Sequence, residues 1–291
     1  MKNLFVVTLF IVFGFSSFAQ NEITSSLLWE ISGKKVKSPC YIFGTMHMMP
    51  KEDFYFPESL KEKLLHSELL VMEIGGISEQ MKGMNLMMLD SGNLFDDFFS
   101  KEQLDTLFQY AQANLGMDET KMRKSLSGMK PFVLLQLLSK NEFGENPESY
   151  ELTFETLAKQ NQIPVDGLET IEEQLGFINN MANDQQVKMI MSTIRGSNND
   201  DSAYNSRKLI EIYLGQNIDE IHDFIAKSDT NSEEFEETFL NKRNANWIKP
   251  IQKIIKNKKA FIAVGAGHLG GEKGVIQLLK NAGYTLTPIK M

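Results

Sequence analysis

Two of the four histidines in this 291-residue chain end Gly-x-x-His motifs, and each motif follows a short apolar run. The first motif begins at Gly44 and ends at His47, and the second begins at Gly265 and ends at His268. A glycine at the first position lets the backbone turn sharply and approach another segment closely. One such motif occurs often by chance, whereas two at equivalent positions of two similar units indicate that both histidines belong to one site.

A third apolar run, ELLVMEI at 68–74, ends close to the carboxylate of Glu73. Ligands of open α/β sheets bind at the carboxyl ends of the strands, where Glu73, His47 and His268 are all predicted to lie. Two histidines and one carboxylate form an open site for a divalent metal ion such as manganese, cobalt or zinc. The metal would activate a water molecule and polarise a carbonyl group, with Glu73 as either the third ligand or the general base.

Two other interpretations of these residues stay open. The histidines could be hydrogen-bonded turn residues, with Glu73 paired to an arginine such as Arg243, because a buried carboxylate needs a partner. Two histidines and one carboxylate also suit a non-haem iron oxygenase.

The elements that must position these residues are strands near the two ends of the chain and helices between them. Apolar runs bounded by glycine or proline predict strands at 27–31, 40–44, 68–74, 163–168, 260–264 and 284–289. Two capping boxes, which begin at Ser100 and Thr170, predict helix starts. Helical periodicity predicts further helices at about 57–66, 131–140, 151–161, 185–195, 203–215, 218–227, 233–257 and 273–282.

This order of elements predicts an α/β fold with a mixed central sheet. The sheet would be built from two strand-GxxH-helix-strand units, at 41–74 and 260–289, each a candidate βαβ crossover. A large helical insertion, at about 77–257, would separate the two units. No linker rich in proline and glycine divides the chain, so we expect residues 20–291 to form a single domain.

The first 19 residues have the three parts of a secretory signal peptide: a positive start at Lys2, an apolar stretch at 4–15 and a small-x-small cleavage site at 17–19. The apolar stretch is shorter than the roughly 20 residues that span a bilayer, so cleavage is expected. No later run is apolar enough to span a membrane. The mature protein is therefore expected to be exported, either to the periplasm or to the medium.

Charge and cysteine content exclude several classes of function. The chain has 38 acidic and 30 basic residues and a net charge of −8, which argues against a nucleic acid as partner. Cys40 is the only cysteine, so there is no intrachain disulfide and no metal site with several cysteines.

The motifs along the mature chain resemble the TraB/GumN family, whose animal relatives are the TIKI metalloproteases. They cover nearly the whole mature chain in the expected order. The resemblance implies an α/β core shared with ChaN-like and erythromycin-esterase-like proteins. The matching segments are LLWEISG (27–33), YIFGTMH (41–47), LLVMEI (69–74), VDGLETIEEQL (165–175), KRNANWIKPI (242–251) and AFIAVGAGHLGGEKGVIQLLKNAGYTLTPI (260–289).

In TIKI proteins the two GxxH motifs and a glutamate are linked to metal-dependent proteolysis. The resemblance therefore implies that His47, His268 and Glu73 bind the metal, with Gly44 and Gly265 as the motif glycines. It implies an exported metal-dependent hydrolase, a TIKI-like metallopeptidase that acts on a peptide or protein. The alternative is a non-catalytic protein of the same fold that binds or sequesters a peptide or a haem-like ligand, because relatives such as pheromone-shutdown proteins act by binding.

Other residues match the family in part. Arg243 and Asn244 match its RNxxW helix, where Arg243 could orient Glu73 or hold a substrate carboxylate, and either residue could help to hold the oxyanion. Glu169 matches its GLET turn and is predicted to cap the next helix. Many bacterial relatives carry Gly-x-Asp before the helix near 151, where this chain has Glu151, and this departure leaves the role of Glu151 open.

The remaining notable side chains are predicted to be structural. Trp247 lies four residues after Arg243 on the same helix face, which favours core packing. His66 and His222 are predicted to face solvent. The methionine-rich segment at 81–88 (MKGMNLMM) is predicted to pack as an ordinary helix, with a peptide groove as the alternative.

Overall fold

The computed structural model describes residues 24–291 except 34, 35, 37, 141, 142, 145, 180, 197–205, 227–232, 234 and 235. The predicted signal peptide, residues 1–19, lies outside the described residues. No helix of the described chain is both long and apolar enough to cross a membrane.

One mixed sheet contains six strands in the order β4-β3-β5-β2-β1-β6. The strand β1 is antiparallel to both of its neighbours, β2 and β6, whereas β2, β5, β3 and β4 are parallel to one another. The structure confirms the predicted α/β class, and each predicted strand is present. The bounds are β1 Leu28–Ser32, β2 Cys40–Thr45, β3 Leu69–Met72, β4 Val165–Gly167, β5 Ala260–Gly265 and β6 Thr285–Ile289.

The two predicted strand-GxxH-helix-strand units interleave within the sheet. The first unit runs from β2 through α1 (Glu58–Leu65) to β3, and the second runs from β5 through α14 (Val275–Asn281) to β6. The strand β5 lies between β2 and β3, so β2 and β5 are parallel neighbours, with Thr45 opposite Gly265. Because these two strands end at the same edge of the sheet, the two GxxH motifs leave it side by side.

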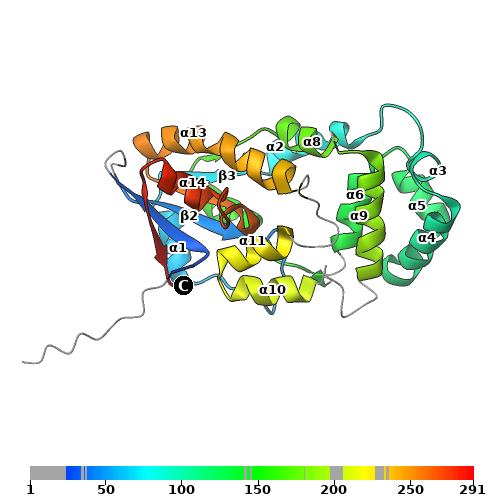
Figure 1. The fold of residues 1–291 in the computed structure, drawn as a ribbon, viewed down its shortest axis with the longest axis horizontal. Coiled ribbons are helices and arrows are strands. Elements are labelled where there is room, and N and C mark those ends of the chain that lie inside the picture. The colour runs from blue at the N-terminus through cyan, green and yellow to red at the C-terminus, as the bar shows by residue number, and fades with distance from the viewer. Residues whose placement is uncertain are drawn as a thin grey trace, which may run out of the picture.

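A helical region lies between β3 and β5, as predicted, although β4 from this region joins the edge of the sheet. Several of its helices make up the right half of the molecule in the view of Figure 1. The predicted helix at 233–257 is in fact two pieces, the π-helical turn η3 and α13. The bounds are α2 Ile77–Lys82, η1 Gly83–Met87, α3 Leu94–Phe98, α4 Lys101–Leu115, α5 Glu119–Leu126, α6 Pro131–Lys140, α7 Tyr150–Gln160, α8 Ile171–Asn179, α9 Asn183–Gly196, α10 Ser206–Leu214, α11 Ile218–Ala226, η3 Glu236–Asn241, α13 Lys242–Asn257 and η4 Ala266–His268.

Helices cover both faces of the sheet, and each face has its own apolar core. On one face, α13 and α14 pack Trp247, Ile251 and Leu279 against strand residues such as Ile262. On the other face, the core contains residues of α1, α7 and α10. Phe154 of α7 belongs to this core together with Phe43 of β2 and Phe261 of β5. A further apolar cluster joins α3, α4, α5, α6 and α9. Strands buried on both faces explain why the strand sequences are continuous apolar runs.

Both predicted capping boxes are present. The Ser100 side chain accepts a hydrogen bond from the Gln103 backbone at the start of α4, and the Gln103 side chain accepts one from the Ser100 backbone. Thr170 and Glu173 make the same reciprocal pair at the start of α8. These caps satisfy backbone N–H groups that have no partner within the helix.

The motif glycine Gly44 is expected to be intolerant of a side chain. A Cβ atom at Gly44 would lie 2.8 Å from Leu269 Cδ1 and 3.0 Å from Ala266 Cα, so the contact of β2 with η4 and the residue after it leaves no room for it. We expect Gly44→Ala to lower the free energy of unfolding by about 1–3 kcal/mol, as overpacking does. Gly176→Ala is the matched control, because a Cβ atom there meets nothing within 4 Å in α8. The control should gain about 0.5–1 kcal/mol in urea unfolding, and equal effects of the two changes would contradict this packing.

Candidate functional site

Glu73 directly follows β3, and its side chain is buried beside the ends of β5 and α13. Its Oε1 accepts a hydrogen bond from the backbone N–H of Gly265 at 2.7 Å. Its Oε2 accepts hydrogen bonds from Arg243 Nη2 at 2.5 Å and from Gln174 Nε2 at 3.3 Å. Burial alone would raise the pKa of Glu73, but the Arg243 charge and the hydrogen bond from the Gly265 N–H hold it well below its usual value. Glu73 is therefore a stable carboxylate.

The buried guanidinium of Arg243 connects Glu73 to a second buried carboxylate, Glu169. Arg243 Nη2 donates to Glu169 Oε1 at 2.5 Å, and Nε donates to both Glu169 oxygens. Nη1 donates to the Phe239 carbonyl and to His268 Nε2. An arginine has five N–H donors, and these contacts use all of them. The predicted pairing of Glu73 with Arg243 is therefore present in the structure.

His268 lies in η4, directly after β5, and it is held in one tautomer. The Asn244 amide donates to the Lys273 carbonyl, so its Oδ1 faces His268 Nδ1 at 2.7 Å. The hydrogen of His268 is therefore on Nδ1, and Nε2 accepts from Arg243 at 3.1 Å. Burial lowers the pKa of His268 to about 3, so this ring is neutral.

His47 differs from His268 because its side chain is 69% exposed. Its Nδ1 lies 2.9 Å from Glu151 Oε1, the first-turn carboxylate of α7. Thr45 and Ser149 also donate to the Glu151 carboxylate and fix its position. The charge of Glu151 raises the pKa of His47 to about 9.

The side chains of His47, His268 and Glu73 converge at Gly265, the motif glycine at the end of β5. A Cβ atom at Gly265 would lie 3.2 Å from Glu73 Oε1, 3.5 Å from His268 Cδ2 and 3.9 Å from His47 Nε2. Since all three atoms lie within 4 Å of that point, the two rings approach within 8 Å of each other. The prediction that these three residues lie together is therefore supported by the geometry.

The donor set does not fit a metal ion held by both histidines in this arrangement. Within the described residues, no three His, Cys, Asp or Glu side chains are placed to hold a metal ion. Arg243 Nη1 donates to His268 Nε2, the atom whose lone pair a metal would need, and its positive charge would oppose a cation there. A shared metal would require Arg243 to move, so the predicted set of His47, His268 and Glu73 as ligands stays a prediction.

The predicted role of Arg243 in holding an oxyanion conflicts with the geometry, whereas that of Asn244 stays a prediction. All N–H donors of Arg243 already have partners, and the Asn244 amide donates to Lys273. Both residues hold Glu73 and His268 in place. Sequence reasoning left the role of Glu151 open, although the acidic residue that many relatives carry at this position was a usable signal, and its contact with His47 is visible only in the structure.

The other side chains predicted to be structural differ in their burial and contacts. Trp247 is buried as predicted, and its indole N–H also donates to Glu169 at 3.1 Å. Thr170 caps α8, but the Glu169 side chain pairs with Arg243, so the predicted capping role of Glu169 is wrong. His66 is exposed as predicted. The prediction for His222 is wrong: it is buried, because α11 packs its ring against the backbone of the glycine-rich loop after η4.

The prediction of ordinary helix packing is wrong for most of the methionine-rich segment. Met81 and Met84 are 64% and 62% exposed, and Met88 is also exposed. The segment is broken into the short helix α2 and the 3₁₀ helix η1, which face α8 on one side only. Short helices with one contact face leave the remaining side chains in solvent.

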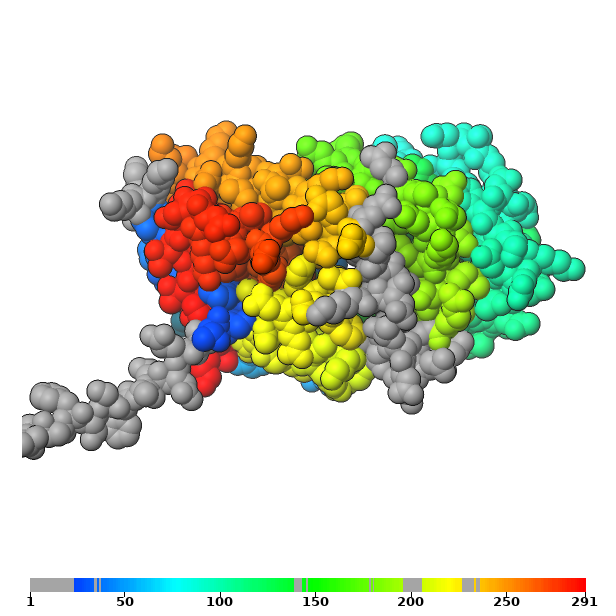
Figure 2. Space-filling model, in the orientation of Figure 1, coloured from blue at the N-terminus to red at the C-terminus, as the bar shows by residue number. Residues whose placement is uncertain are grey.

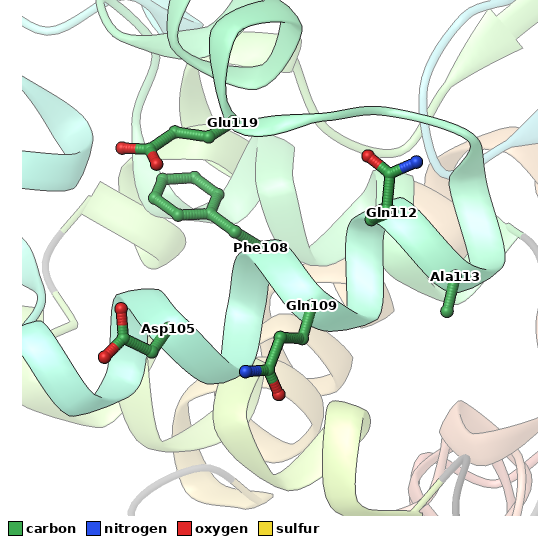
Figure 3. Close-up of a pocket in the computed structure, with 6 residues that line it drawn as sticks. All are labelled: Asp105, Phe108, Gln109, Gln112, Ala113 and Glu119. Atoms are coloured by element: carbon green, nitrogen blue, oxygen red, sulfur yellow. The ribbon is translucent and has the colours of Figure 1, made fainter.

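A shallow surface pocket lies away from this site, on α4 and the start of α5 (Figure 3). None of its lining residues belongs to the site around Glu73. Figure 3 shows Phe108 beside Glu119 at one end of the pocket, with polar side chains along α4.

A pH-dependent loss of stability is expected from the neutral state of His268. Its pKa is near 6.5 when unfolded, whereas burial lowers the folded value to about 3. The unfolded chain binds one more proton between these values, so the free energy of unfolding falls by up to about 1.4 kcal/mol for each pH unit lost there. Urea titrations at several pH values in this window measure how the free energy of unfolding changes with pH. In His268→Gln this dependence should correspond to about one proton fewer than in the wild type. Equal slopes would contradict a buried neutral His268.

Comparison with known proteins gives one family match. The model of the TraB/PrgY/gumN family matches residues 27–288. No curated protein and no solved structure matches the chain.

Proposed function

Because this chain belongs to the TraB/PrgY/gumN family, we propose that it is an exported hydrolase that cleaves peptide bonds at the site around His47. The observation that carries the proposal is the pairing of His47 with Glu151. An exposed imidazole is bonded through Nδ1 to a fixed carboxylate and has its Nε2 directed toward the end of β5 beside Glu73. This arrangement suits a general base that acts on a water molecule.

In the proposed reaction, neutral His47 takes a proton from water through Nε2 while the oxygen attacks the carbonyl carbon of the substrate. The tetrahedral intermediate then collapses, and His47 returns the proton to the leaving amine. Glu151 holds the ring and stabilises the imidazolium. Glu73, which stays ionised, would accept a hydrogen bond from the same water. Arg243, Asn244 and His268 act as positioning residues, because they contact Glu73 or one another.

Exposed apolar side chains on the segments that adjoin the site support a peptide substrate. Six of the seven large apolar side chains that are exposed in the described chain lie within 15 residues after His47, Glu73 or Glu151 in sequence. Contiguous apolar surface marks binding sites for other molecules, and methionine adapts well to varied partners. The six residues are Tyr55, Ile77, Met81, Met84, Met88 and Leu152.

The test is a peptide-library digestion with the chain from Gln20 onward, in the presence of a metal chelator. We expect new peptide termini, detected by mass spectrometry, with the wild type and none with His47→Gln. Cleavage that requires added manganese, cobalt or zinc would overturn His47 as a metal-independent base and favour the metal-bound form. Peptide binding without cleavage under every condition would overturn the hydrolase and favour the binding protein.

A further inference from the structure

The carboxy-terminal part of the chain has a charge opposite to that of the whole protein. Residues 242–291 contain ten lysine or arginine residues and a single acidic residue, Glu272. This segment therefore carries a net charge of +9 within a chain whose total is −8. The charge is concentrated in α13, where the 16 residues from Lys242 to Asn257 contain no acidic residue.

The exposed lysines of α13 form one stripe. At about 100° per residue, Lys242, Lys249, Lys253 and Lys256 fall within about 60° of one another around the helix axis. All four are exposed, and they lie opposite the face that buries Arg243, Asn244, Trp247, Ile251 and Ile255. With a rise of 1.5 Å per residue, the stripe is about 21 Å long. We call these four residues the lysine stripe.

The lysine stripe forms no ion pair with neighbouring elements of the described chain. None of its four lysines has a carboxylate within ion-pair distance among the described residues. Glu237 lies near the amino-terminal end, where it interacts with the charge of Lys242, but its ion pair is with Lys273. Glu68 lies at the other end, where it accepts from the Lys259 backbone. The adjacent helix α14 adds Lys280 and has no acidic residue.

The lysine stripe also lies at an outer edge of the molecule. In Figure 1, α13 runs along the top of the fold, and in Figure 2 its atoms form part of the outer surface. The same helix presents Arg243 and Asn244 to the candidate site from its opposite face. A flat partner could therefore reach the stripe without contacting that site.

We propose that the lysine stripe docks the protein on the surface of an anionic lipid bilayer. Charge complementarity carries the proposal, because juxtaposed lysines are attracted to negatively charged headgroups over a flat area. The lysines lie on a convex helix with no enclosing pocket. Such a surface suits the spread-out charge of many lipid headgroups better than it suits a single bound phosphate group. The stripe has no exposed aromatic residue for stacking on bases, since Trp247 is buried, so a single-stranded nucleic acid fits it less well. This proposal does not rest on the proposed hydrolase.

The test is co-sedimentation of the chain from Gln20 onward, which contains every described element, with lipid vesicles. One set of vesicles mixes phosphatidylglycerol with phosphatidylcholine, and the other contains phosphatidylcholine alone. We expect binding only to the anionic vesicles at low salt, and its loss at high salt because of screening. Reversing three charges in Lys249→Glu/Lys253→Glu/Lys256→Glu should weaken binding by about 100-fold or more. This figure follows because the loss of each lysine weakens binding by about fivefold, and the three factors multiply.

The matched control is Lys101→Glu/Lys121→Glu/Lys124→Glu, which makes the same change in net charge on exposed lysines of α4 and α5. It should bind within about threefold of the wild type, and circular dichroism should show that both triple variants fold. Equal loss in the two variants would show that only net charge matters, which overturns the proposal. Binding to neutral vesicles as tightly as to anionic ones would also overturn it, as would binding to a DNA duplex without binding to vesicles.

Discussion

Replacement of Arg243 by methionine is expected to lower the free energy of unfolding by about 3–5 kcal/mol, the largest stability effect of any single change in the site. Arg243 is the partner of two buried carboxylates, Glu73 and Glu169, and it also donates to His268. Methionine preserves much of the apolar volume but leaves two negative charges buried beside each other. Denaturant unfolding of the purified variant measures the effect.

Arg207→Met is the control for this prediction. Arg207 also makes a 2.5 Å ion pair, with Asp53, but its side chain is 57% exposed, so its loss should cost about 1 kcal/mol or less. Adding Glu169→Gln to Arg243→Met should recover part of the stability, because one of the two uncompensated charges is removed. If Arg243→Met costs no more than Arg207→Met, the buried network does not carry the stability assigned to it.

Replacement of His47 by glutamine is expected to lower kcat for peptide cleavage by about 10²–10⁴-fold, the usual contribution of a general base. The folded state should change little, because the His47 side chain is largely exposed and leaves the Glu151 carboxylate with Thr45 and Ser149 as donors. Steady-state kinetics on a peptide found in the library digestion measure the loss.

His66→Gln is the control variant for His47→Gln. His66 is an exposed histidine at the end of α1, and its ring is hydrogen-bonded to the backbone of the same helix. This variant should retain wild-type kinetics. A His47→Gln enzyme that retains more than about a tenth of the activity would remove His47 from the role of base.

Much of the fold was predictable from local sequence patterns. Strands buried on both faces require continuous apolar runs, so segments such as AFIAV at 260–264 predicted β5 almost to the residue. The capping box at Ser100 likewise fixed the start of α4. The strand order was not predictable, because no local pattern states that β5 inserts between β2 and β3. That insertion is what brings the two GxxH motifs side by side.

The candidate site was predictable in its members and less so in its contacts. His47, His268 and Glu73 do lie together, because each follows a neighbouring parallel strand. The sequence could not show that Arg243 donates to both Glu73 and His268, since that contact depends on the rotation of α13 against the sheet. The same limit applies to His222, whose burial depends on the packing of α11 against the loop after η4.

The central claim, that His47 acts as a base held by Glu151, is tested most directly by the pH dependence of kcat/KM for peptide cleavage with a metal chelator present. Glu151 raises the pKa of His47 to about 9, so wild-type activity should rise with pH through a pKa above the ordinary value near 6.5. In Glu151→Gln this limb should move to lower pH, while its maximal rate falls. Activity that disappears with the chelator, or a limb at the same pH in both proteins, would contradict the claim.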